Sequence, residues 1–156
     1  MAPDRLQIEF DLSGLGWMDI RLSRGSWYRQ LDGLSYLTPV LDDVVAMALS
    51  SMEGTTSSFA TFELEPGQLR LSCETRKART VLRATEADNF TRKRLPARKP
   101  AWEIAFYAPG EFGRAVLAGA NMLEKQLGHE GYAQLWSRDP FPAMALGKLK
   151  KALEGA

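Results

Sequence analysis

The side chains best suited to nucleophilic or acid–base chemistry occur only once each in this sequence. His129 is the only histidine and Cys73 the only cysteine among 156 residues. An imidazole titrates near neutral pH, and a thiolate is a strong nucleophile when it is exposed beside positive charge. His129 lies in a polar Gly-His-Glu-Gly segment, where the side chain of the adjacent Glu130 diverges from it. We therefore interpret His129 as a solvated loop residue and Cys73, which alternates with leucines, as a buried hydrophobe.

Two pairs of carboxylates have the chemistry to bind a divalent cation. Asp42 and Asp43 fall near the start of a predicted helix, where the helix dipole favours negative charge. Glu63 and Glu65 fall at a strand end and in the turn that follows it. These local roles account for both pairs, and there is no second histidine or cysteine to complete a zinc site. We predict neither a metal site nor a cofactor.

The glycines and serines form no familiar catalytic or phosphate-binding motif. Gly14 and Gly16 lie between two predicted strands and not between a strand and a helix. The chain contains no Gly-Lys-Ser, Gly-Lys-Thr or Gly-x-Ser-x-Gly sequence. The sequence therefore favours a non-catalytic protein. An enzyme that uses His129 or carboxylates in a pocket between the sheet and the C-terminal helices remains an alternative.

The most unusual local composition is a basic cluster near the middle of the chain. Arg92, Lys93, Arg94, Arg98 and Lys99 place five cations within eight positions. Such a cluster can neutralise phosphates and release counterions from a nucleic acid. It can equally bind an acidic protein surface, or it can be a solvated loop without a partner. We treat it as a candidate interaction segment.

The tryptophans supply the second set of candidate interaction residues. The alternation of residues 102–106 predicts that Trp102 faces the core of its strand. Trp17 and Trp27 are expected on or near the opposite face, with Tyr28 close by. Aromatic residues with arginine neighbours are typical of protein interfaces. Packing of these aromatics beneath the C-terminal helices is the alternative interpretation.

Alternating apolar residues predict five strands, because a period of two places every second side chain on one buried face. Residues 26–31, after the turn at Arg24-Gly25, and residues 79–84, after a loop at 75–77, are predicted as two further strands. The predicted strands cover residues 6–12, 18–22, 26–31, 60–64, 69–73, 79–84 and 102–106. Residues 65–68, Glu-Pro-Gly-Gln, fit a type II turn with proline second and glycine third. Residues 85–100 have no periodicity and are predicted to form a loop.

Helical periodicity separates these strands and follows them. Residues 39–53 carry an apolar stripe, with Thr38 predicted as the N-cap. Residues 109–127 form a second amphipathic stretch that Gly128 should break or cap. Tyr132 and Trp136 share a face of a short following helix, and a last helix starts after Pro142.

This order of elements predicts one α+β domain over residues 1–156. We expect an antiparallel sheet of about six to seven strands, with one central helix and two to three C-terminal helices packed on one face. Leu41, Val45, Leu49, Phe112 and Leu123 are among the side chains expected to pack on that sheet.

Composition limits the classes of partner. The 20 lysines and arginines nearly balance the 19 aspartates and glutamates. The net charge therefore gives no reason to expect binding to a nucleic acid or to an anionic membrane. The first residues do not form the apolar run of a signal peptide, and no apolar stretch is long enough to span a bilayer. We expect a cytoplasmic protein without a membrane partner.

Several short motifs resemble, in the same order, a group of short bacterial proteins of unknown function. They are Gly14-Leu15-Gly16-Trp17, Ser35-Tyr36-Leu37 with Leu41-Asp42-Asp43-Val44, Glu65-Pro66-Gly67, and Gly131-Tyr132 with Leu135-Trp136 and Pro140-Phe141-Pro142. The resemblance spans most of the chain but implies no catalytic residues. The basic segment 92–99 has no counterpart in this pattern. In size and style the chain is also similar to immunity proteins, which neutralise a toxin by binding it.

The sequence therefore supports three hypotheses about function. The first is a protein-interaction module of the immunity or regulatory type. The second is a nucleic-acid-binding protein that uses the basic segment 92–99, a hypothesis that the near-neutral net charge disfavours. The third is the enzyme described above.

Overall fold

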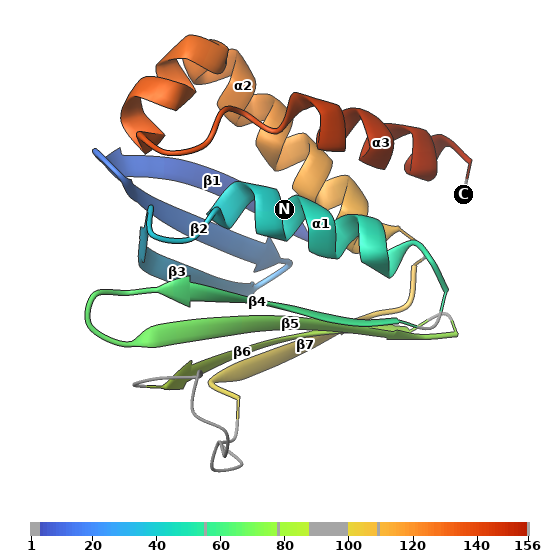
Figure 1. The fold of residues 1–156 in the computed structure, drawn as a ribbon. Coiled ribbons are helices and arrows are strands. Elements are labelled where there is room, and N and C mark those ends of the chain that lie inside the picture. Colours follow the sequence, from blue (N-terminus) through green and yellow to red (C-terminus); the bar gives the residue numbers. More distant parts are fainter. Residues whose placement is uncertain (1–3, 55, 78, 88–99, 109, 156) are drawn as a thin grey trace.

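The first three strands form an antiparallel meander at one end of a computed structural model (Figure 1). The model describes residues 4–54, 56–77, 79–87, 100–108 and 110–155. The strands are β1 (Gln7–Gly14), β2 (Trp17–Arg24) and β3 (Trp27–Ser35). Ile8, Phe10 and Ile20 point to the core, as the period of two predicted, and Phe10 lies opposite Ile20 in the register.

The remaining four strands form a second antiparallel sheet. They are β4 (Thr56–Glu63), β5 (Gln68–Arg76), β6 (Arg79–Ala87) and β7 (Trp102–Phe106), paired in chain order. Phe62, Leu71 and Leu82 are buried on one face of this sheet. The α+β class and the seven predicted strands are confirmed, although β6 extends to Ala87, into the segment predicted as loop.

The prediction of one sheet with six to seven strands is wrong, because the strands divide into sheets of three and four. No ladder of hydrogen bonds joins the two sheets within the described residues, although β3 and β4 lie close together. Arg24, at the end of β2, connects them differently: its Nη1 donates to the Ala105 carbonyl of β7 over 3.0 Å. Periodicity identifies which face of a strand is buried but not its neighbour across a helical connection, so the sequence left this division undetermined.

The central helix α1 (Val40–Ser51) covers the region where the two sheets meet (Figure 1). The first two turns of its stripe are buried as predicted, with Leu41 and Val45 completely inaccessible to solvent. Leu49, expected on the same face, is only partly buried. Asp42 and Asp43 lie in the first turn. The predicted N-cap was wrong by one residue: Pro39 precedes the helix, and the Thr38 side chain makes no capping hydrogen bond.

The C-terminal helices lie on the same side of the sheets as α1 (Figure 1). Helix α2 (Glu111–Trp136) includes the short helix predicted after it, and Gly128 interrupts the helical conformation with φ 69° and ψ 171°. Helix α3 (Ala143–Glu154) buries Leu146 and Leu149. At Gly119 the helix α2 approaches β1 so closely that an added Cβ would lie 2.5 Å from the Ile8 carbonyl oxygen. Packing of helices on the sheets, as predicted, closes the core.

The turn between β4 and β5 differs from the predicted type II turn. The peptide bond between Glu65 and Pro66 is cis, and the Leu64 N–H donates to the Gly67 carbonyl over 2.9 Å. Proline is therefore the third residue of the turn and not the second, which the residue types alone did not reveal. Among the described helices, none combines the length and apolar composition needed to cross a lipid bilayer.

Candidate interaction surface

Three large apolar side chains are exposed at the corner where β1, β3 and α2 meet. Leu15 is 69% exposed, Tyr36 41% and Leu37 48%. Leu15 lies in the turn between β1 and β2, and the other two residues lie between β3 and α1. We call these three residues the apolar corner. The half-buried Trp17 lies next to this corner, because its backbone on β2 is paired with Ser35 on β3, the residue directly before Tyr36.

Backbone hydrogen bonds hold the segments of this corner together. The Tyr36 N–H donates to the Gly16 carbonyl over 2.9 Å, and the Gly16 N–H donates to the Leu135 carbonyl over 2.7 Å. The buried hydroxyl of Ser35 accepts a hydrogen bond from the Leu37 N–H at 3.2 Å. Three segments distant in sequence are thereby joined at one point.

Arg138 adds a charged clamp to the same corner. Its Nη1 donates to the carbonyls of Tyr36, at 3.2 Å, and of Leu37. Its Nε lies 3.3 Å from Asp139 Oδ2. A guanidinium that binds two consecutive carbonyls restrains the backbone that carries the exposed side chains. The clamp therefore reduces the freedom of Tyr36 and Leu37 to move independently of the fold.

Gly16 permits the close packing that the corner requires. Its φ of 75° lies in the left-handed region, which favours glycine. A Cβ at this position would approach the Tyr36 ring to 2.9 Å. The ring therefore lies directly on the glycine, and the sequence Gly-Leu-Gly-Trp allows the turn and this ring contact together.

Beneath the corner is a group of buried polar atoms that make no hydrogen bond within the described part of the chain. It comprises Thr38 Oγ1, Asp42 Oδ1, Tyr132 OH, Trp136 Nε1 and Asp139 Oδ2. Tyr132 and Trp136 are completely buried. The group extends from the start of α1 to the segment that follows α2. Asp139 Oδ2 still lies within ion-pair distance of Arg138, but burying the other four atoms without partners costs free energy. We call it the polar support.

Ionisation of Asp42, Asp43 and Tyr132 is disfavoured in this region. Burial raises the pKa of Asp42, and the nearby charges of Asp139 and Asp43 raise it further, while Arg138 lowers it. Burial likewise raises the pKa of Asp43. Burial, followed by the charges of Asp42 and Asp139, raises the pKa of Tyr132 well above its usual range. The acidic side chains of Asp42, Asp43, Asp139 and Tyr132 therefore lie in one region, with Arg138 beside them.

The residues predicted to form an interaction site do not come together in one surface within the described part of the chain. Arg92, Lys93, Arg94, Arg98 and Lys99 lie outside the described residues, so the role of the basic segment stays a prediction. Trp17 faces outward, as expected.

The expected placement of Trp27 on the face of Trp17 is wrong. The register pairs Arg24 with Trp27 and Leu22 with Arg29, so Trp27 shares the inward face of Leu22. It packs against the core and meets Trp102, with ring centroids 5.5 Å apart and planes at 78°. Tyr28, on the other face, is exposed. The two-residue turn after Arg24 is a sequence signal that predicts this register.

The candidate catalytic residues occupy different environments. Cys73 is buried in β5, and burial raises the pKa of its thiol to about 11, so it is protonated at neutral pH. His129 lies in α2, where its Nε2 is 2.6 Å from Glu124 Oε2 and its ring stacks on Phe141. His129 is exposed, as expected, but the prediction of a loop is wrong, because His129 lies within α2 directly after the break at Gly128. Its partner is Glu124 and not the neighbouring Glu130.

The acidic pairs also fall into different settings. Glu63 accepts a hydrogen bond from Gln68 Nε2 at 2.5 Å, while Asp42 and Asp43 belong to the polar support region. In the ranges that the structure describes, no three His, Cys, Asp or Glu side chains come together in a way that could hold a metal ion.

The comparisons with known proteins give no further guide to this surface. No protein-family model, no curated protein and no solved structure matches the chain.

Proposed function

We propose that this protein is a non-catalytic binding module that recognises a protein partner through the apolar corner. The observation that carries the proposal is the exposure of Leu15, Tyr36 and Leu37 on a backbone held by hydrogen bonds from two other segments. An immunity or regulatory protein is the functional type that this role suggests.

The energetics of binding favour such a surface. Covering exposed apolar area contributes roughly 25 cal/mol per Å². Much of that gain is lost when a mobile segment must be ordered on binding, so a pre-ordered backbone raises affinity. The hydrogen bonds that Arg138 donates to the Tyr36 and Leu37 carbonyls supply that order before any partner arrives. Tyr36 is a tyrosine in this patch, and tyrosine is among the residue types that dominate binding energy at interfaces.

The polar support offers independent grounds for a function in this region. Tyr132 and Trp136 place a hydroxyl and an indole N–H in the interior without hydrogen-bond partners among the described residues. Natural sequences depart from local stability rules mainly where function requires it. The three segments of the corner also contain the motifs Gly14-Leu15-Gly16-Trp17, Ser35-Tyr36-Leu37 and Leu135-Trp136, which the proposal explains as parts of one surface.

The test is affinity capture from the native extract followed by quantitative binding to the purified partner. Leu37→Asp should weaken binding by at least about 30-fold, because it places a charge in an apolar contact (about 2 kcal/mol at a hot spot). The control is Met144→Asp on α3, since Met144 is an equally apolar and even more exposed side chain away from the corner. It should leave the affinity within about twofold.

Two outcomes would contradict the proposal. One is a partner that binds both aspartate variants as tightly as it binds the wild-type chain. The other is a wild-type chain that sediments as a dimer and becomes a monomer with Leu37→Asp, because the corner would then be a contact between copies. Circular dichroism of each variant checks that a loss of binding does not reflect a loss of structure.

A further inference from the structure

The face of the first sheet that points away from the core carries an excess of carboxylates. On β1, β2 and β3 the buried side chains of Phe10, Ile20 and Leu31 point inward, so the residues next to them in each strand point outward. Among the described residues of these strands, the outward set contains one guanidinium, that of Arg21. Its four carboxylates, which we call the acidic face, are Glu9, Asp11, Asp19 and Asp32.

Two of these carboxylates face each other across neighbouring strands. Asp11 lies directly opposite Asp19 in the register of β1 and β2, and like charges in such a pair destabilise an antiparallel sheet. Arg21 compensates only in part, since its Nε lies 3.1 Å from Glu9 Oε2 and its Nη1 lies 3.5 Å from Asp11 Oδ2. Asp19 Oδ1 accepts a hydrogen bond from the Gly33 N–H over 2.9 Å, but the Asp19 charge has no ion pair within the described residues.

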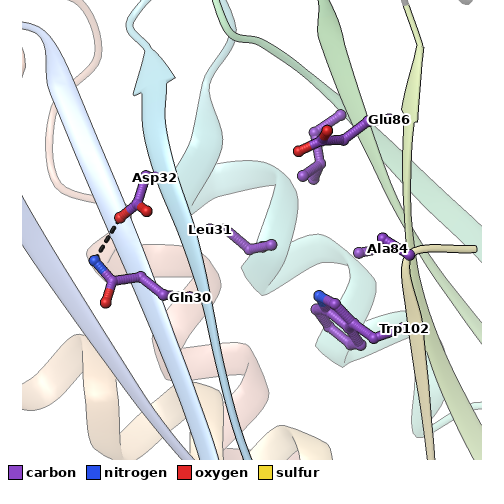
Figure 2. Close-up of a pocket in the computed structure, with 8 residues that line it drawn as sticks. Gln30, Leu31, Asp32, Ala84, Glu86 and Trp102 are labelled. Carbon is purple, nitrogen blue, oxygen red and sulfur yellow. Dashed lines mark hydrogen bonds between the residues drawn. The ribbon is translucent and has the colours of Figure 1, made fainter.

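Asp32 adds a further charge from β3. Figure 2 shows its side chain on the side of β3 away from Leu31, where its Oδ1 accepts a hydrogen bond from Gln30 Nε2. Gln30 lies opposite Arg21 in the register, so Asp32 shares the outer face with them. Asp32 is exposed and forms no ion pair in the part of the chain that the structure describes. With four carboxylates and one guanidinium, this face has a formal net charge of −3.

The second sheet places opposite charges next to each other instead. Arg83 on β6 lies between Glu74 on β5, at 3.3 Å, and Glu103 on β7, at 2.5 Å. The whole chain is also nearly neutral, with 20 basic and 19 acidic side chains, so the excess on the first sheet is local. A local field of one sign increases the rate at which a partner of the opposite charge associates.

The acidic face adjoins the apolar corner. Trp17 lies next to the corner at the start of β2, and Asp19 follows it on the same face of the strand. Two residues of a strand cover about 7 Å, so a partner that covers the corner and Trp17 also reaches the carboxylates. An apolar centre with a charged border is the usual arrangement of a protein interface.

We propose that the partner of this protein is a basic protein, whose cationic side chains contact the acidic face while an apolar part of the same surface covers the apolar corner. This inference rests on the proposed function, because it names the chemistry of the partner for that same surface. The charges act mainly on association, since opposite fields steer the two proteins together and salt screens them. The apolar contact determines mainly how slowly the complex dissociates.

The first test is the kinetics of binding to the partner captured from the native extract, measured by surface plasmon resonance. Asp11→Asn combined with Asp32→Asn removes two exposed charges and keeps Asp19, whose carboxylate accepts a backbone hydrogen bond. At about 20 mM salt this double variant should associate at least about fivefold more slowly than the wild-type chain, with a dissociation rate within about twofold. At about 300 mM salt the difference should nearly vanish. The matched control, Glu53→Gln combined with Glu154→Gln, removes the same charge at exposed positions outside the first sheet and should change the association rate by less than about twofold.

The outcomes separate this inference from the proposed function. If Leu37→Asp weakens binding but the double asparagine variant associates as fast as the wild-type chain, the basic partner is overturned and the proposed function stands. If Leu37→Asp has no effect, the proposed function fails, and a labelled octalysine peptide still tests the acidic face by fluorescence anisotropy. At about 20 mM salt the wild-type and control chains should bind octalysine at least about fivefold more tightly than the double asparagine variant. Equal affinity of octalysine for all three chains would overturn the acidic face as a surface that binds cations.

Discussion

The apolar corner and a small pocket between β3 and the second sheet both use β3, but they are constructed in opposite ways. The pocket has a volume of about 260 Å³, and Leu31, Ala84 and Trp102 supply apolar surface to it (Figure 2). The corner projects apolar side chains into solvent from a backbone that Gly16 and Arg138 hold, above completely buried Tyr132 and Trp136. The pocket is a concave opening between strands, with exposed polar residues at its rim. A convex apolar surface fits a macromolecule, whereas a small concave site fits a small ligand.

The difference also predicts where each region is sensitive to substitution. Changes beneath the corner alter the stability of the fold, because its supports lie in the core. Changes at the exposed residues beside the pocket should have little effect on stability, because these residues are solvated. The four predictions that follow test this contrast.

The largest expected effect concerns the two tryptophans. Trp136→Ala should lower the free energy of unfolding by about 3–5 kcal/mol, because it empties a completely buried site. Trp102→Ala, at the half-buried wall of the pocket, should cost about half as much, since less area leaves the solvent there on folding. Urea denaturation followed by circular dichroism measures both. Equal costs would remove the contrast between core support and pocket wall.

Alanine substitutions at Gly16 and Gly33 separate the cost of displacing the Tyr36 ring from the cost of backbone strain. Gly16 and Gly33 have positive φ values of 75° and 65°, but only at Gly16 would a Cβ meet a neighbour, the Tyr36 ring. Gly33→Ala should therefore cost about 1–2 kcal/mol from backbone strain alone. Gly16→Ala should cost about 1–3 kcal/mol more, because the ring must move. Similar denaturation midpoints for the two variants would mean that Tyr36 shifts freely and that the corner is not rigid.

A smaller effect is expected from pH at the polar support. The pKa of Asp42 is raised in the folded protein above its ordinary value of 3.8, mainly by burial. The folded state therefore holds this proton more tightly than the unfolded state. The resulting stabilisation is complete at pH values below the ordinary pKa and is lost as the pH rises through the raised pKa.

Asp42→Asn removes this dependence. The variant should be more stable than the wild-type chain at pH 7, and the advantage should shrink as the pH is lowered toward 4. Thermal denaturation across this range gives the difference between the two proteins, which cancels the contributions of other carboxylates. Asp139, Asp43 and Arg138 face the same region and remain unchanged. A difference that is independent of pH, or that grows toward acid, would contradict the assignment.

The smallest effect is expected at the hydroxyl of Tyr28. Tyr28→Phe removes the hydrogen bond to Gln30 at the exposed rim, so stability should change by less than about 0.5 kcal/mol. Urea denaturation followed by circular dichroism measures the change. A loss above about 1 kcal/mol would show that this exposed row of hydrogen bonds on β3 supports the fold.

Local patterns in the sequence determined the elements of this fold. A period of two identified five of the seven strands, and the turns and loops before them identified the other two. The stripe that contains Leu41 and Val45 identified the buried face of α1. These predictions succeeded because alternation and helical repeats report burial directly, whichever element covers the buried face. The outward position of Trp17 followed from the same rule.

Other features depended on contacts between distant segments. The division into two sheets and the pocket beside Leu31 depend on which strands become neighbours across α1, which no local repeat encodes. The inward position of Trp27 depends on the register of a two-residue turn. The sequence supplied the residues of the corner in three separate segments, but only the tertiary structure placed Gly16, Tyr36 and Arg138 in contact, because hydrogen bonds over such separations form only when the helices pack on the sheets.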